Sequence, residues 1–265
     1  MKYTEIQQII DTMKNAGYDY KKEIAEIENM QSRALVSAFQ QPKGDSPAAY
    51  AAPLTLSDHI KAMLYAQLSN NRPWQPIYNN RLTIDAIFSH YDAEALKKAD
   101  PAVLVAQITQ IRCGNRQIKK QMQNLKANIE TLEKIETEYG SISHYYAVTE
   151  LVDVIKSLSQ SGKPYKLGCM GIPLVCEYLK GVGVEVIKPD SLLCRLLGRL
   201  GYTPKIPATA WEAIDICRQI GKEYGLSQAE VDTILWQFCA KDKFEVCTDK
   251  PKCAQCGVHS CPSRL

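Results

Sequence analysis

Four cysteines close together near the C-terminal end carry the clearest chemistry in this sequence. Cys247, Cys253, Cys256 and Cys261 are separated by five, two and four residues, so the middle pair forms a Cys-x-x-Cys motif. Such thiolates bind zinc or an iron–sulfur cluster, or form disulfides. The other six cysteines are scattered and the sequence shows no secretory leader, which favours a reducing compartment and argues against disulfides. We therefore expect a metal centre at these cysteines, with zinc and iron both open.

A carboxylate, Asp190, is the second candidate for chemistry. It stands at the start of a segment with apolar residues at helical spacing, namely Leu192, Leu193, Leu196, Leu197 and Leu200. Arg195 and Arg199, four residues apart, lie on another face of the same helix. The position of Asp190 predicts a helix N-cap. A catalytic role is also open, because the two roles do not exclude each other.

A glycine-rich turn precedes this helix and is a candidate for anion binding. The residues Leu167-Gly168-Cys169-Met170-Gly171 lie between apolar segments, and Pro173 follows at a first-turn position of a short helix. This helix is predicted to run to Leu179, before Gly181 and Gly183 end it. A Gly-x-x-Gly turn lets the backbone approach a ligand closely, and the unpaired N–H groups behind it face an anion. Phosphate is the expected ligand.

The order of helical hairpin, glycine break, Pro-Asp-Ser and leucine-rich helix resembles the helix-hairpin-helix DNA glycosylases, the endonuclease III superfamily. The resemblance covers about residues 54–261. In that family an aspartate just after the hairpin is the catalytic carboxylate, and Asp190 occupies its place. The resemblance also implies that Gly168, Met170 and Gly171 contact DNA.

The same resemblance bears on the metal and on two lysines. The family carries a [4Fe–4S] cluster on a C-terminal loop, which implies this cluster at the four cysteines, with zinc as the alternative. Each long gap between the cysteines is one residue shorter here than in the family. Lys250-Pro-Lys252, before the second cysteine, matches the basic loop that lies against DNA phosphates in the family. We therefore expect Lys250 and Lys252 to contact DNA.

A glutamine upstream is a further DNA-binding candidate. The segment LTLSDHIKAMLYAQLSNN resembles the first core helix of the family, whose Ala-Gln pair supplies a glutamine that fills the gap left by a flipped base. Ala66-Gln67 matches this pair. By helical periodicity alone, Gln67 is an ordinary polar residue at a helix end.

Two departures from the family pattern restrict the expected reaction. Pro173 stands where bifunctional members carry a lysine that forms a Schiff base and nicks the strand, so we expect a monofunctional enzyme that leaves an abasic site. Lys163, Lys166 and Lys188 lie nearby in the sequence and leave a displaced lysine open. Members that remove mismatched adenine use a glutamate where this chain has Ala62. By elimination, the expected substrate is an alkylated purine.

Two other classes of function stay open at this point. One is a non-catalytic DNA-binding protein of the same fold, which the proline at position 173 supports. The other is an unrelated zinc-binding regulator, for which the cysteines are the only argument.

Composition and charge place few limits on the function. Of 265 residues, 45% are hydrophobic and 23% charged, and the net charge of +3 is too small to indicate a polycation. Arg112, Arg116, Lys119 and Lys120 form a local basic cluster, which is either a solvated face or a phosphate contact. No apolar run approaches the ~20 residues that span a bilayer. We expect a cytoplasmic monomer, nucleoid-associated in a bacterium, that acts on double-stranded DNA with a damaged or mismatched base and has no membrane partner.

The predicted architecture is all-α, with two domains, a cleft between them and the cysteine loop at the end. Residues 1–53 are expected to form a helical extension and linker that packs with the C-terminal domain. Residues 54–188 form the core domain with the hairpin, and residues 189–265 the C-terminal domain. Helices are predicted at two places within 1–40 (the second at about 20–40), from Ser57, at 82–90, 93–98 and 101–111, from Asn115 to Gly140, at 148–160, around Trp211 and from Ser227; residues 182–187 are a connector.

Overall fold

The computed structural model describes residues 2–19, 21–22, 54–241 and 243–265. In these residues every regular element is a helix, which confirms the all-α prediction. No helix within them is long and apolar enough to cross a membrane. The second N-terminal helix and the linker predicted up to residue 53 lie outside the described residues.

Contacts between residues divide the described chain into two units. One unit holds residues 54–184, and the other combines the N-terminal residues with 185–265. The boundary falls inside the connector predicted at 182–187, which contains no strand.

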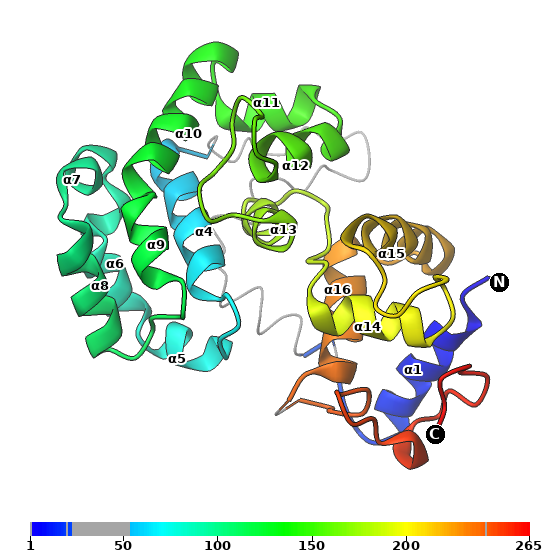
Figure 1. Ribbon diagram of the computed structural model, residues 1–265. Coiled ribbons are helices and arrows are strands. Elements are labelled where there is room, and N and C mark those ends of the chain that lie inside the picture. Colours follow the sequence, from blue (N-terminus) through cyan, green and yellow to red (C-terminus); the bar gives the residue numbers. More distant parts are fainter. Residues whose placement is uncertain (1, 20, 23–53, 242) are drawn as a thin grey trace. The chain divides into compact units, whose positions relative to one another are not determined.

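Residues 54–184 form a bundle of short helices (Figure 1). Its elements are α4 (Leu56–Leu68), α5 (Trp74–Asn79), α6 (Arg81–Ile87), the 3-10 helix η1 (Ser89–Tyr91), α7 (Ala93–Lys98), α8 (Pro101–Gln110), α9 (Ile118–Gln123), α10 (Leu125–Tyr139), α11 (Ile142–Val148), α12 (Leu151–Ser159) and α13 (Ile172–Gly181). Helix α13 packs on α4 and α12, and α10 packs on α7 and α11. Completely buried side chains such as Ile60, Met63 and Val175 form the core at the α4–α13 contact.

The second unit joins the two ends of the chain. It contains α1 (Thr4–Asn15), α14 (Ser191–Arg199), α15 (Ala210–Tyr224), α16 (Gln228–Cys239) and the short 3-10 helix η2 (Cys253–Gln255). Helix α1 packs on α16, and the hydroxyl of Tyr3 donates to Gln219 of α15 at 2.7 Å. The ring of Tyr3 also packs edge-on against Tyr202.

Local capping signals fixed several helix ends as predicted. Asp190 caps α14, Ser227 forms a capping box with Glu230 at the start of α16, and Gly140 ends α10 in the left-handed conformation. Helices α7 and α8 also match their predicted ranges to within one residue.

Other predicted boundaries were wrong. Helix α4 is capped by Thr55 rather than Ser57, because Thr55 and Asp58 form a reciprocal capping box. The long helix predicted from Asn115 is two helices, α9 and α10, that meet at Asn124. Asn115 lies before α9, and its side-chain amide donates to the carbonyl oxygen of Gln67 at 2.7 Å. Helices α5 and α11 were not predicted.

Candidate functional site

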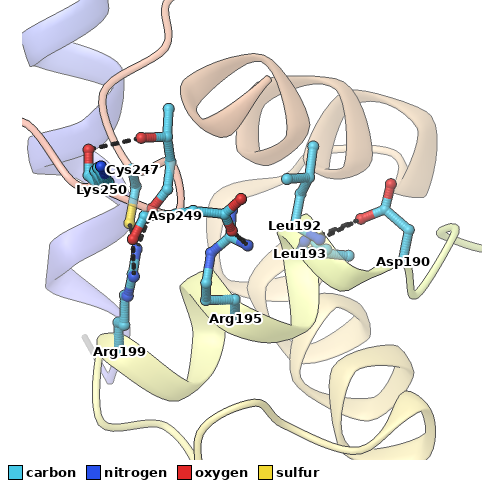
Figure 2. A network of polar contacts seen from close by, with 9 residues as sticks. Asp190, Leu192, Leu193, Arg195, Arg199, Cys247, Asp249 and Lys250 are labelled. Atoms are coloured by element: carbon cyan, nitrogen blue, oxygen red, sulfur yellow. Dashed lines mark hydrogen bonds and ion pairs between the residues drawn. The ribbon is translucent and has the colours of Figure 1, made fainter. Parts of the chain in front are cut away.

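Asp190 lies at the start of α14, where the carboxylate uses one oxygen as a cap. Oδ1 accepts hydrogen bonds from the backbone N–H groups of Leu192 at 2.9 Å and Leu193 at 3.0 Å (Figure 2). Within the described residues, the other oxygen, Oδ2, has no hydrogen-bond partner. The side chain is half-buried. The cap therefore fixes the carboxylate in place and leaves one oxygen for another interaction.

The four candidate ligands, Cys247, Cys253, Cys256 and Cys261, line one small cavity of ≈ 30 Å³. The rest of the lining is mostly apolar and includes residues of α14 and α16, with two arginines; it comprises Leu196, Arg199, Leu200, Phe238, Val246, Pro251, Val258, Ser263 and Arg264. In the described part of the chain, no three His, Cys, Asp or Glu side chains converge closely enough to hold a metal ion. The thiols share a cavity, and their sulfur atoms bond to protein groups.

Arg199, the last residue of α14, contacts the first and the last of these cysteines. Its Nη1 donates to Sγ of Cys247 at 3.5 Å, and its carbonyl oxygen accepts from the thiol of Cys261 at 3.3 Å. The guanidinium also donates to the carbonyl oxygens of Thr248 at 2.5 Å and Asp249 at 3.2 Å (Figure 2). One residue of α14 therefore holds both ends of the cysteine loop.

Two further arginines hold the loop from either side. Arg195, one turn before Arg199, forms an ion pair with Asp249 (Figure 2). Arg264 donates to the carbonyl oxygens of Cys256 at 3.0 Å and Val258 at 3.1 Å. Three guanidinium groups thus bind the loop, Arg199 and Arg264 through backbone carbonyl oxygens and Arg195 through the Asp249 side chain.

Helix α1 also supports the cysteine loop. A Cβ atom at Gly257 would lie 2.2 Å from Oγ1 of Thr12, so only glycine fits against α1 there. The hydroxyl of Ser260 donates to Glu5 of α1 at 2.9 Å. The N-terminal helix and the C-terminal loop are therefore parts of one packed structure.

The electrostatic surroundings of the four thiols differ. A hydrogen bond from Cys239, together with Arg199 and Arg195, lowers the pKa of Cys247. Burial raises the pKa of Cys256 and Cys261. Four thiols beside arginine side chains are a donor set that fits a thiolate-bound zinc ion or iron–sulfur cluster.

The two predicted DNA-binding lysines lie on this loop and are both exposed. Lys252 forms an ion pair with Glu245, with 3.3 Å between Nζ and the carboxylate. The ammonium of Lys250 makes no hydrogen bond or ion pair within the described residues, while its carbonyl oxygen accepts from Thr248 at 2.7 Å. Lys250 is therefore the freer of the two cations.

The glycine-rich turn lies in the unit of residues 54–184. The N–H of Gly168 donates to Oδ1 of Asn128 at 2.5 Å, and its carbonyl oxygen accepts from Nδ2 of the same residue at 3.1 Å. A Cβ atom at Gly168 would lie 2.2 Å from Oδ1 of Asn124. Glycine is therefore required here by a side chain of the protein itself, and the N–H of Gly168 is already bonded.

The rest of this turn is divided between the interior and the surface. Met170 is completely buried, and its N–H donates to the carbonyl oxygen of Leu167 at 3.2 Å. Gly171 is exposed at the N-cap of α13, which has no side-chain cap. At the start of α13, Ile172 has a backbone N–H and no side chain caps the helix, whereas Pro173 has no N–H, so this helix start offers few donors to an anion.

Gln67 is not on the surface in this structure. Its side chain is 0% exposed, and neither amide atom has a hydrogen-bond partner in the described residues. Its carbonyl oxygen accepts from Asn115 and Gln121. Gln67 lies in the last turn of α4, at a helix end as the periodicity indicated, but it is buried in the core rather than exposed to solvent.

The predicted site residues thus fall in the two units. Asp190, the cysteines and both lysines belong to the unit with 185–265, whereas Gln67 and the glycine turn belong to 54–184. Sequence reasoning missed the roles of Asn124 and Asn128, which no local pattern reveals. It noted Arg195 and Arg199 at helical spacing but could not identify their partners in the cysteine loop.

No family model matches the chain, and neither curated proteins nor solved structures give a match. The function is therefore inferred from the residues and their geometry.

Proposed function

We propose that this protein is a monofunctional DNA base-excision glycosylase, which hydrolyses the N-glycosidic bond of a flipped damaged base, with an alkylated purine as the expected substrate. The observation that carries the proposal is the arrangement on α14. This helix begins at a carboxylate with one uncommitted oxygen and ends at Arg199, which holds a loop with four cysteines.

In this reaction Asp190 has two tasks, which are to stabilise positive charge on the sugar and to accept a proton from water. A base inside the duplex is out of reach, so the nucleotide rotates out of the stack. Positive charge develops on the deoxyribose as the N-glycosidic bond breaks, and a carboxylate beside the sugar stabilises it. The bond electrons leave on the base, the oxygen of a water molecule bonds to C1′, and Asp190 accepts the proton that this water loses. A base that already carries positive charge leaves as a neutral molecule and needs little acid catalysis.

The DNA contacts belong to backbone and lysine groups. The uncapped N–H groups at the start of α13 and the exposed Lys250 and Lys252 bind phosphates, which holds the duplex without reading its sequence.

Cys247, Cys253, Cys256 and Cys261 would hold the [4Fe–4S] cluster, or zinc in the alternative case. The bound group would supply a cross-link between parts of the loop, and Arg195, Arg199 and Arg264 hold the loop in place around it.

The capping contacts of Asp190 favour a second candidate, a DNA-binding protein of this fold without catalysis. A helix cap explains an aspartate at this position without any reaction. A displaced Schiff-base lysine is less well supported. Lys166, in the glycine turn, donates to the carbonyl oxygens of Leu167 at 2.5 Å and Met170 at 2.6 Å. Burial lowers its pKa, but these contacts hold the ammonium in the turn.

The decisive variant is Asp190→Asn, because asparagine caps helices as well as aspartate does. We expect it to fold and to bind DNA like the parent protein, with base excision at least 100-fold slower, about the effect of losing one catalytic group. The assay incubates duplexes that carry single alkylated, oxidised or mismatched bases and converts abasic sites into strand breaks with alkali.

Asp100→Asn is the matched control, since Asp100 is also a helix cap and accepts from the N–H of Ala102 at 2.8 Å. This variant should retain full excision. Retained excision in Asp190→Asn would contradict the proposed mechanism. DNA binding by the parent protein with no breaks at any lesion would favour the non-catalytic candidate.

A further inference from the structure

A basic surface that the proposed reaction does not use lies at the turn between α8 and α9. The sequence contains no aspartate or glutamate between Asp100 and Glu130. The same stretch carries Arg112, Arg116, Lys119 and Lys120, all exposed, in the turn and in the first turn of α9. Local sequence therefore concentrates positive charge here without supplying any counter-charge.

The fold adds a fifth cation from a different part of the chain. A guanidinium nitrogen of Arg72, in the segment between α4 and α5, donates to the carbonyl oxygen of Arg112. No acidic residue occurs between Asp58 and Asp85, so this segment brings no carboxylate either. Within the described residues, none of the five cations forms an ion pair. We refer to Arg72, Arg112, Arg116, Lys119 and Lys120 as the basic turn.

Buried hydrogen bonds hold the backbone of the basic turn in place. The buried side-chain amide of Asn115 donates to the carbonyl oxygen of Gln67 at 2.7 Å, and that of Gln121 donates to the same oxygen at 3.2 Å. Asn115 also donates to Oε1 of Gln121 at 3.1 Å. Arg112 itself has a left-handed backbone, with φ of 56°. Because the turn is already ordered, a ligand there binds without the entropy cost of ordering it.

We infer that the basic turn binds the phosphate backbone of double-stranded DNA, as a contact surface separate from the turn before α13 and from the cysteine loop. Five positively charged side chains without acidic partners attract a polyanion. They spread over a turn, the start of a helix and a second segment, which suits successive phosphates of a duplex better than one small anion. The identity of the partner depends on the proposed function, whereas the anion-binding character depends on the charges alone.

The test compares two double variants with the same change in charge. Lys119→Glu with Lys120→Glu removes two cations of the basic turn. Lys98→Glu with Lys222→Glu removes two exposed lysines elsewhere. Binding of the full-length protein to an undamaged, fluorescein-labelled duplex is followed by fluorescence anisotropy over a range of KCl concentrations, and circular dichroism checks that both variants are folded.

We expect the basic-turn variant to bind the duplex at least tenfold more weakly. The slope of log K against log salt should become shallower by about 2, since each lost phosphate contact reduces it by about 1. The control variant should keep the parent slope. Equal slopes and affinities for the two variants would overturn the inference.

The outcome separates the two proposals. Normal binding by the basic-turn variant, with excision that depends on Asp190, would overturn the basic turn and leave the glycosylase proposal intact. Weakened binding by this variant, with no excision by the parent protein, would support the basic turn and count against the glycosylase. A parent protein that does not bind duplex DNA at low salt would overturn both.

Discussion

His59 is a titratable group in the core of the unit of residues 54–184. It lies on α4 with 0% exposure, and its Nδ1 is 2.9 Å from the hydroxyl of Tyr178. The hydroxyl of Tyr178 is 2.8 Å from that of Tyr146. Burial lowers the pKa of His59 to about 4, although the charge of Asp58 acts in the opposite direction. The imidazole is therefore neutral in the folded protein at neutral pH.

This burial predicts a loss of stability in acid. The unfolded chain binds a proton at His59 below about pH 6.5, whereas the folded protein resists protonation until about pH 4. His59 should therefore not affect stability above pH 6.5. As the pH falls from 6.5 to 4, it should lower the free energy of unfolding by roughly 3 kcal/mol. Urea denaturation of the parent protein and of His59→Gln at pH 7 and pH 4.5 measures this.

The variant should be less stable at pH 7, because Tyr178 loses a partner, but should lose less stability in acid. An identical pH dependence in the two proteins would show that His59 is not the responsible group.

At the scale of single elements, the two glycines of the turn before α13 differ in whether their surroundings leave room for a side chain. Gly168 faces the side chain of Asn124, where α9 and α10 meet, and has no room for a Cβ atom. At Gly171 the nearest atom to a Cβ would be Cδ of Pro173, at 3.9 Å. The backbone of Gly171, with φ of −83°, suits any residue.

We therefore expect Gly168→Ala to destabilise the protein by about 1–3 kcal/mol, because the methyl group overlaps Asn124. Gly171→Ala should change stability by less than about 0.5 kcal/mol. Chemical denaturation of both variants measures the difference. Equal stabilities would contradict the packing explanation, and weaker DNA binding by Gly168→Ala at full stability would instead assign Gly168 to ligand contact.

At the scale of the whole molecule, the cysteine loop packs within the unit that the two ends of the chain form. It contacts α1 through Gly257 and Ser260 and contacts α14 through Arg199. The other unit has its own core, formed by α4, α10, α13 and their neighbours. Stability contributed by a metal centre should therefore be confined to one unit.

We expect the purified protein to be brown and to contain iron. After iron removal with a chelator, hydrogen exchange should become faster in α1 and α14, while α10 stays unchanged, because bound metal stabilises only the elements that hold it. Mass spectrometry of deuterated peptides locates the change. A colourless protein that contains zinc would establish the alternative metal, and equal acceleration in α10 would contradict confinement to one unit.

The sequence by itself determined the helical class, many helix ends and the candidate residues. The caps at Asp190, Ser227 and Gly140 were predictable because capping depends on residues within one helical turn. The four cysteines stood out because they are close in sequence. The cap at Thr55 was predictable on the same ground, because Thr55 and Asp58 are three residues apart in a capping-box pattern, but the prediction placed the cap at Ser57.

Only the tertiary structure decided which residues act together. Arg199 with the cysteine loop, Asn128 with Gly168 and Arg72 with Arg112 are each at least 40 residues apart in the chain. Such partners meet because packing of apolar helix faces brings distant segments together, and helical periodicity gives the face of each helix but not its neighbour. The buried position of Gln67 has the same origin, since α4 is covered on more than one side.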